Sequence, residues 1–263
     1  MLFSNHPRTH YMKAPVHEVI CQLRFPTILS INTTEPADFQ ERIREDFPQY
    51  VRRQDATPPQ LVMNNGKPEL RQAPPTANYN FLSADGRWKI NLTRDFIALS
   101  TLSYPGWEEF ARHLDKPLAA FIELYKPASF QRVGLRYVNL VSRAALGLED
   151  SGWDDLFAPA YTAIYQEGDV FEEKVLSTGT DLVLQLDSSS RVKIHAGPGQ
   201  VKNRQQGAPQ DTEVKFIFDM DLSMATNTPC NLAAPALETL HGHATRIFEG
   251  AITDELRQAM VEE

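Results

Sequence analysis

The chain has 263 residues, of which 42% are hydrophobic and 23% charged, as in globular proteins and unlike disordered ones. No apolar run reaches 18 residues, so the sequence predicts no membrane-spanning helix, and residues 1–6 lack the layout of a secretory signal. The net charge of −8 is uneven: residues 1–145 hold 18 basic and 14 acidic side chains, whereas residues 146–263 hold 8 and 20. This asymmetry predicts two units, the second of which would repel phosphate.

The two cysteines indicate a reducing compartment. Cys21 falls within an apolar strand pattern, and Cys230 lies far from it in the sequence. We therefore expect two free thiols and a cytoplasmic protein.

Residues 1–145 begin with a strand pattern and a helix pattern. Alternation of apolar and polar residues predicts a strand over 17–25, and apolar residues spaced by four predict a short helix over 36–47. Residues 52–77 are rich in Pro, Gln and Asn and predict an irregular segment with a short strand near 61–63.

The rest of this half contains a hairpin, the longest helix of the half and a final strand. Asp85-Gly86 is a strong two-residue turn signal between strand patterns at 79–82 and 88–92. Further expected elements are a strand at 96–102, a helix at 107–125 and a strand at 130–141. The order predicts a ferredoxin-like β-α-β-β-α-β half with an additional strand, its antiparallel sheet covered on one face by the 107–125 helix.

Residues 146–263 predict an antiparallel sheet backed by a long C-terminal helix, which makes the whole chain an α+β protein of two β-rich halves. Residues 153–165 predict a short helix or loop. Strands are expected at 170–186 with a break at 177–179, at 191–195 and at 213–222. The final helix is expected over 235–260, interrupted near Gly250, with Thr253 capping the last turn.

Three segments carry a family resemblance. They are Tyr11-Met12-Lys13-Ala14-Pro15-Val16-His17-Glu18, Arg132-Val133-Gly134-Leu135-Arg136-Tyr137-Val138-Asn139, and the block from His241 through Phe248-Glu249 to Ile252-Thr253. In this order they resemble a sporadically distributed prokaryotic family of similar length, with a Y-x-x-A-P-V-x-E opening and no established activity. The resemblance implies a patchy distribution, which is common among accessory defence and toxin-control genes, but it implies no reaction.

Arg132 and Arg136 are the first candidate site residues. With Gly134 between them they share one face of the expected strand, as a pair that could clamp a carboxylate or phosphate. The alternative is a structural arginine, at least half buried and paired with an acid, for which Glu18 on the expected neighbouring strand is the first choice.

Residues 188–210 are the second candidate. No acid lies between Asp187 and Asp211, and the segment includes a Gly-Pro-Gly run at 197–199. The basic and histidine side chains of the segment are Arg191, Lys193, His195, Lys202 and Arg204. They could bind an anion or a nucleic-acid backbone, or form a flexible solvated loop.

Catalytic and metal sites have no support in the sequence. No Cys-x-x-Cys, His-Glu-x-x-His, Gly-x-Ser-x-Gly or phosphate-loop pattern occurs. His241 and His243 diverge on a helix, and we expect His241 to pack or hydrogen-bond between helix and sheet. Asp219 and Asp221 share a strand face and could bind metal or act as acid and base, or they could face solvent. We expect no catalytic residue, metal or cofactor.

The sequence thus favours a non-catalytic binding or regulatory protein over an enzyme. We expect it to act through a protein partner or a small anionic ligand, without nucleic acid or membrane. The alternative is an RNA-binding or metal-independent RNA-cleaving protein that uses the basic 188–210 segment, with His195 as acid or base.

Overall fold

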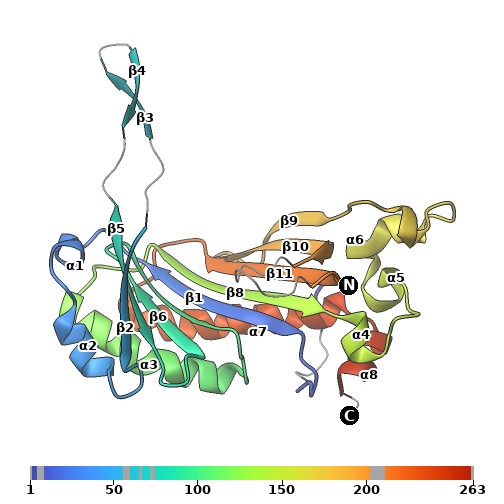
Figure 1. The fold of residues 1–263 in the computed structure, drawn as a ribbon, viewed down its shortest axis with the longest axis horizontal. Helices are drawn as coiled ribbons and strands as arrows, with labels where there is room; N and C mark the ends of the chain where they lie inside the picture. Colours follow the sequence, from blue (N-terminus) through green and yellow to red (C-terminus); the bar gives the residue numbers. More distant parts are fainter. Residues whose placement is uncertain are drawn as a thin grey trace. The chain divides into compact units, whose positions relative to one another are not determined.

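The computed structural model describes residues 2–4, 9–55, 60–64, 67–71, 75–201 and 211–261 (Figure 1). The strands are β1 (Val16–Arg24), β2 (Gln49–Asp55), β3 (Gln60–Asn64), β4 (Lys67–Arg71), β5 (Thr76–Leu82), β6 (Trp88–Leu92), β7 (Phe96–Thr101), β8 (Arg132–Val141), β9 (Thr180–Gln185), β10 (Ser190–Gln200) and β11 (Val214–Met224). The α-helices are α1 (Leu29–Thr33), α2 (Ala37–Ile43), α3 (Trp107–Tyr125), α4 (Arg143–Leu146), α5 (Trp153–Leu156), α6 (Pro159–Thr162), α7 (Ala233–Ala251) and α8 (Asp254–Val261).

Nine of these strands form one sheet in the order β2-β5-β6-β7-β1-β8-β11-β10-β9, and β3 pairs with β4 in a separate hairpin. The chain divides into two compact units. Unit 1 contains residues 1–19, 134–226 and 234–263, and unit 2 contains residues 20–133 and 227–233. The predicted boundary at residue 145 differs from this division, which cuts through β1 and β8. The mixed helix and strand content, the large antiparallel sheet and the C-terminal helix are as predicted.

Unit 2 is built on β1 and α3, both of which were predicted closely. Helix α3 is amphipathic, and its Phe121 ring lies 4.6 Å from that of Phe25, which directly follows β1. One helical turn from the other end, Phe110 packs against Trp88 of β6 at 5.9 Å. The predicted turn between β5 and β6 places Gly86 at φ 71°, a left-handed conformation that glycine adopts without strain.

Unit 1 places α7 against one face of strands β8, β11 and β10, as predicted for the second half. The Tyr137 hydroxyl of β8 lies 2.9 Å from His241 Nδ1 of α7, and the ring of Phe218 lies 6.3 Å from that of Phe248. His241 therefore joins helix to sheet, as expected. Helix α7 runs past Gly250 to Ala251, and Thr253 Oγ1 accepts the Leu256 N–H at 3.3 Å, which confirms the predicted cap of α8.

Strands extend further than predicted in two segments. Residues 52–77 contain the end of β2, and all seven β2 residues are exposed, so the strand has no apolar alternation to reveal it. The predicted short strand near 61–63 is confirmed as β3. The predicted strand at 191–195 is the central part of β10, which extends to Gln200 and includes the Gly-Pro-Gly run, so the alternative of a flexible loop is wrong for residues 190–200.

The predicted strand at 170–186 was too long. Only β9 within it is a strand, and Glu172–Lys174 forms a 3₁₀ turn. Glycine remains necessary at 197 because a Cβ there would lie 2.7 Å from the Thr178 carbonyl oxygen in the segment that leads into β9.

Candidate functional site

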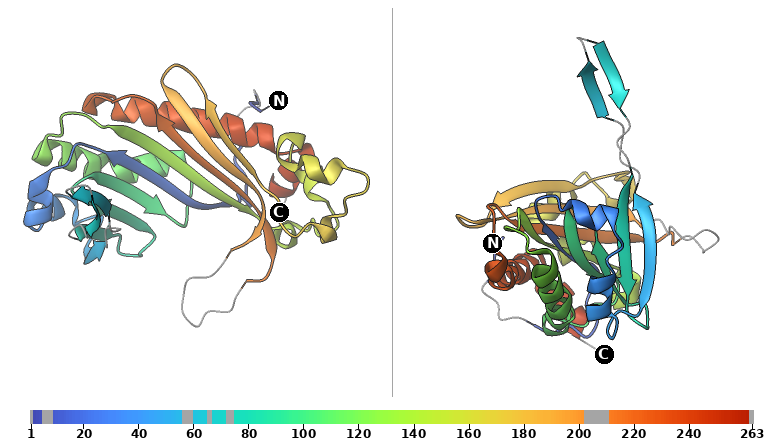
Figure 2. Two further views of the ribbon diagram at one scale, coloured as in Figure 1. Left: turned by 90° about the horizontal axis from the view of Figure 1, so that it is seen from above. Right: turned by 90° about the vertical axis from the view of Figure 1, so that its left-hand side faces the viewer.

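The face of the unit 1 sheet that points away from α7 carries most of the predicted site residues. Since Tyr137 and Phe218 contact α7, their neighbours Arg136 and Asp219 point to the opposite side of the sheet. Figure 2 (left) shows strands β8, β11 and β10 in front of α7. We call this side the open face; its polar and apolar members are Glu18, Arg136, Val138, Asp181, Val183, Gln185, Arg191, Lys193, His195, Ile217, Asp219 and Asp221.

Strand register arranges the charges of the open face in rows. In one row Lys193 of β10 stands opposite Asp221 of β11, which in turn stands opposite Arg136 of β8. In the next row His195 stands between Asp181 of β9 and Asp219 of β11. Cations and carboxylates thus alternate from strand to strand, an arrangement in which directly opposed side chains attract.

Arg136 forms an ion pair with the carboxylate of Asp219 and not with the predicted Glu18. Its Nε and Nη2 donate to the two carboxylate oxygens of Asp219 at 2.8 and 2.5 Å. The hydrogen bond with Asp219 raises the pKa of the guanidinium above its usual value, and Glu18 adds only a weaker attraction. For Arg136 the prediction of Glu18 as first partner was wrong, because β11 and not β1 supplies the acid. The side chain of Arg136 is 44% exposed and that of Asp219 19%, so the pair is partly open to solvent.

The other candidates on β10 also have polar neighbours. His195 Nδ1 lies 3.1 Å from an Asp181 carboxylate oxygen, and Arg191 Nε donates to the Ser223 hydroxyl at 3.4 Å. Lys202 and Arg204 lie outside the described residues. The predicted cationic cluster is therefore, in its described part, a set of side chains interleaved with acids.

The contacts of Arg136 fit the alternative of an arginine paired with an acid better than a joint clamp with Arg132. They lie four residues apart on β8, which in an extended strand separates their Cα atoms by roughly 13 Å. Arg136 uses two of its nitrogens on Asp219, and Arg132 is partly exposed and takes part in interactions of its own.

Strand β9 forms one edge of the nine-stranded sheet. Leu186 N donates to Ser190 O at 2.9 Å, so this pair belongs to the hydrogen-bonded type of an antiparallel ladder. The register continues it to Leu184–Val192 and Leu182–Ile194. The N–H and C=O groups of the alternate residues, Asp181, Val183 and Gln185, therefore point away from β10. The sequence predicted a strand here but not its place at the edge of the sheet, because that place depends on how the strands pair.

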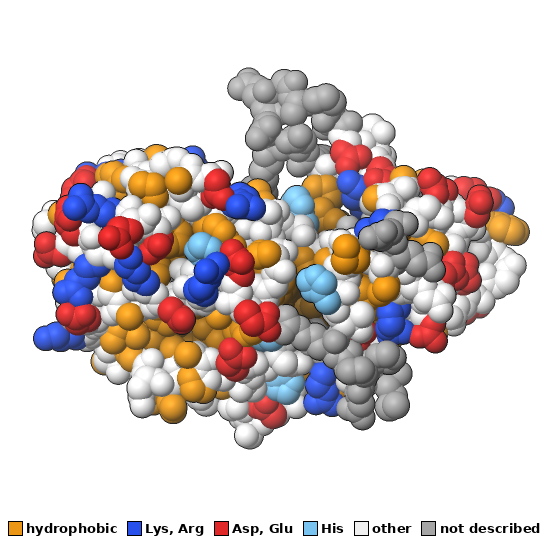
Figure 3. Space-filling model, turned by 90° about the horizontal axis from the view of Figure 1, so that it is seen from below, with side chains coloured by type: hydrophobic (Ala, Val, Ile, Leu, Met, Phe, Trp, Pro, Cys, Tyr) orange, Lys and Arg blue, Asp and Glu red, His pale blue; other side chains and the backbone are white. Residues whose placement is uncertain are grey.

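An acidic segment leads into that edge. Residues 146–187 contain ten Asp and Glu and a single basic residue, Lys174. Figure 3 shows several acidic side chains at its right-hand end, where α4 to α6 lie. Large apolar side chains are exposed in the same stretch: Ile164 (41%), Phe171 (52%), Leu176 (100%) and Val183 (70%). Single exposed apolar side chains are common on protein surfaces, and of these four only Val183 is placed on the open face by the strand register.

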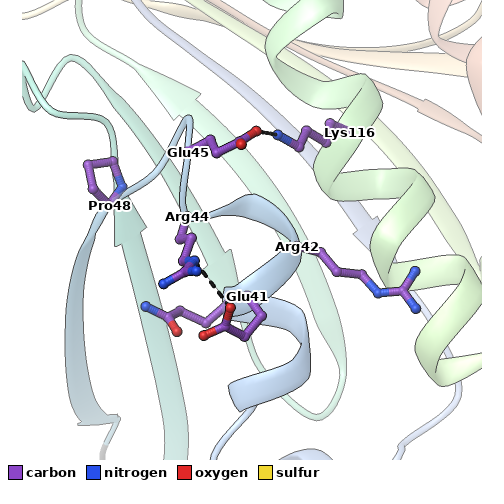
Figure 4. A pocket seen from close by; sticks show the side chains of 7 residues that line it. Glu41, Arg42, Arg44, Glu45, Pro48 and Lys116 are labelled. Carbon is purple, nitrogen blue, oxygen red and sulfur yellow. Dashed lines mark hydrogen bonds and ion pairs between the residues drawn. The ribbon is translucent and has the colours of Figure 1, made fainter.

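Unit 2 holds a separate polar pocket of about 670 Å³ beside α2 and α3, lined by Gln40, Glu41, Arg42, Arg44, Glu45, Pro48 and Lys116. Figure 4 shows that Lys116 reaches Glu45 and that Arg44 reaches Glu41, at 2.9 and 3.1 Å. Arg42 turns to Glu123 at 2.5 Å. An anion would have to displace these carboxylates to reach the basic side chains of the pocket. Acidic and basic side chains are also mixed over the surface around it (Figure 3). The pocket is therefore a weak candidate for an anionic ligand.

Buried polar links join the two ends of the chain within unit 1. Glu249 is 3% exposed and accepts the Tyr11 hydroxyl at 2.7 Å and Arg257 Nε at 3.3 Å. Tyr11 and Glu249 belong to the first and last segments of the family resemblance. Burial, followed by the bond with Glu249, raises the pKa of Tyr11.

A second link joins α7 to the β9–β10 turn. Asp187 accepts the N–H groups of Ser189 and Ser190 at 2.7 and 2.8 Å and lies 2.9 Å from His243 Nε2. Hydrogen bonds, the one from the Ser190 hydroxyl first, lower the pKa of Asp187. This turn holds β9 in its place beside β10.

Among the described residues, no three His, Cys, Asp or Glu side chains are grouped to hold a metal ion. His241 and His243 contact different partners, Tyr137 and Asp187, as their divergence on the helix predicted. No helix in the described part of the chain is long and apolar enough to cross a membrane.

Comparison with known proteins adds nothing to these observations. No protein-family model matches the chain, and a search of curated proteins finds no significant match. Neither result tests the resemblance of the three segments.

Proposed function

We propose that the chain is a non-catalytic binding protein whose open face and adjoining β9 edge contact a protein partner. The observation that carries the proposal is the alternation of Lys193, Asp221 and Arg136 across three strands. Such a surface offers both signs of charge at fixed spacing, which suits the complementary side chains of a polypeptide. Exposed Val183 beside it supplies apolar area.

The alternation also weighs against the RNA hypothesis. A phosphate backbone is bound by cations that are free to neutralise it. On the open face Arg136 is bonded to Asp219, His195 lies against Asp181, and Lys193 stands opposite Asp221. The acids of residues 146–187 would add repulsion. A small anion meets the same difficulty in the pocket beside α2.

The family, the cytoplasmic location and an accessory role in defence or toxin control remain parts of this proposal that the resemblance and the free thiols support. The ferredoxin-like plan of the first half belongs here as well. The chain order β1, α2, β6, β7, α3, β8 and the sheet order β6-β7-β1-β8 support it, with β2 and β5 as additions.

The test is a native pull-down with matched surface variants. The tagged full chain is isolated from extracts of its source cells, with and without ribonuclease, beside Lys193→Glu and Thr239→Glu. The first variant puts an acid opposite Asp221 on the open face, and the second adds the same charge at an exposed position of α7. Both variants are first checked for wild-type melting.

We expect a protein to be retained by the wild type and by Thr239→Glu in the presence of ribonuclease, and to be lost from Lys193→Glu. Retention of RNA, or of proteins that ribonuclease releases, would support the alternative function. Equal retention by both variants would remove the open face from the contact.

A further inference from the structure

The free edge of β9 is the described surface whose chemistry most clearly specifies an occupant. Three consecutive outward residues, Asp181, Val183 and Gln185, turn their N–H and C=O groups to the edge, while their side chains are exposed on the open face. Unpaired edge groups of this kind form hydrogen bonds with an added strand. The edge is also held in register, because the Asp187 turn fixes the end of β9.

We propose that β9 takes up an extended segment of the partner protein as a further antiparallel strand, and that this segment alternates basic and apolar residues. The inference rests on the proposed function, since it assigns the class of partner and the manner of its binding. Antiparallel pairing continues the arrangement of β8, β11, β10 and β9, each of which is antiparallel to the next.

The alternation follows from the two sides of β9. On the open face the added side chains would lie beside Asp181, in a unit whose residues 146–187 carry ten acids and one base, so lysine or arginine is favoured there. On the other face they would lie beside Leu182 and Leu184, which are half-buried, so apolar residues are favoured there. Leu176 and Phe171, which precede β9 in the chain, are exposed as well.

Charge decides between this occupant and two others. Residues 146–187 carry ten acids and one base, so a second copy that paired its own β9 here would bring like charge to like. A nucleic-acid backbone would be repelled in the same way. A cationic segment is attracted, and its association should weaken with salt because exposed charges are screened beyond about 8 Å at physiological ionic strength.

The peptide test uses three fluorescein-labelled probes of the sequence Val-Lys repeated four times, measured by fluorescence anisotropy with the full chain. One probe is unmodified, one is N-methylated at its lysines, and one at its valines. In an antiparallel added strand with lysines on the open face, the lysine amides point to β9 and the valine amides point to solvent. The two methylated probes have the same charge and the same number of methyl groups.

We expect N-methylation of the lysines to weaken binding about tenfold or more, because several backbone hydrogen bonds are lost together, and N-methylation of the valines to leave it within about twofold. Equal binding of both methylated probes would show attraction by charge alone and would overturn the inference. So would the absence of binding by the unmodified probe.

Two variants of the chain test the same edge from the other side. Val183→Pro removes an outward N–H and blocks the edge, but it spares the β10 ladder, because that N–H does not take part in it. Val183→Thr removes apolar area and keeps the N–H. We expect the unmodified probe to lose about tenfold or more in affinity for Val183→Pro and to bind Val183→Thr with a loss of less than about threefold. Similar affinity for both variants would refute strand addition.

Failure of this inference is distinguishable from failure of the proposed function. If the peptide does not bind while the pull-down retains a protein that Lys193→Glu loses, the open face binds a partner of another kind. If the peptide does not bind and the pull-down retains no protein that Lys193→Glu loses, both proposals are refuted.

Discussion

The buried carboxylate of Glu249 gives a prediction whose magnitude follows from its surroundings. Its side chain is only 2% exposed, and that of Arg257, its partner at 3.3 Å, is 14% exposed. Arg257→Met removes the cation and keeps a side chain of comparable length. The carboxylate then stays buried with the Tyr11 hydroxyl but without its counter-charge. Breaking a buried pair in this way costs about 3–5 kcal/mol, so we expect the free energy of unfolding to fall by that amount.

Urea unfolding followed by far-ultraviolet circular dichroism measures the loss. Arg246→Met is the matched control, because Arg246 lies on the same helix α7 as Glu249 but is exposed. We expect the control to change stability by less than about 0.5 kcal/mol. Combining Arg257→Met with Glu249→Gln should recover part of the loss, since an amide is less costly to bury than a carboxylate. A loss below about 1 kcal/mol for Arg257→Met would refute the assignment of a buried ion pair.

Three further predictions concern stability. Tyr161 is 5% exposed, and its hydroxyl is the one buried side-chain polar atom of the described residues without a hydrogen-bond partner. Urea titrations of Tyr161→Phe should therefore show an unfolding free energy that is unchanged or higher by about 1 kcal/mol. Burial raises the pKa of Tyr161 to about 12, above the unfolded value of about 10. The protonated phenol therefore contributes fully to the unfolding free energy below pH 10, and this contribution is lost as the pH rises toward 12. Unfolding curves across this pH range should show a smaller loss of stability in Tyr161→Phe than in the wild type. Arg136→Ala should cost only about 1 kcal/mol, because Arg136 is 44% exposed, and a double-mutant cycle with Asp219→Ala should give a coupling of similar size rather than the several kcal/mol of a buried pair.

The elements with a buried face could be predicted from the sequence. Alternating Val19, Cys21 and Leu23 revealed β1, and the spacing of Phe110, Leu114 and Phe121 revealed α3, because one side of each element packs in the core. Strand β2 is exposed at every residue, so it lacks this signal. The predicted strand at 191–195 covers only part of β10 for another reason: the glycines of the Gly-Pro-Gly run indicate a turn locally, whereas Gly197 is needed for the close approach of the Thr178 backbone.

The candidate site could be predicted only in part, because its partners are set by strand register. Arg136 was identified in one candidate site, and Lys193 and His195 in another. The structure places a carboxylate against each or opposite it, from strands that the sequence does not pair with them. If one of these strands were paired one residue out of register, its side chains would move to the opposite face of the sheet, and the rows of opposed charges would no longer form. The free β9 edge depends on the same information.

The most direct test of the central claim is site-specific photo-crosslinking in the source cells. A photoreactive amino acid replaces Val183, at the junction of the β9 edge and the open face, and in a parallel strain it replaces the exposed Thr239 of α7. After irradiation the adducts of the tagged chain are identified by mass spectrometry. We expect a discrete protein adduct from position 183 and none from position 239. Adducts with RNA at position 183, or the same protein adducts from both positions, would contradict the account.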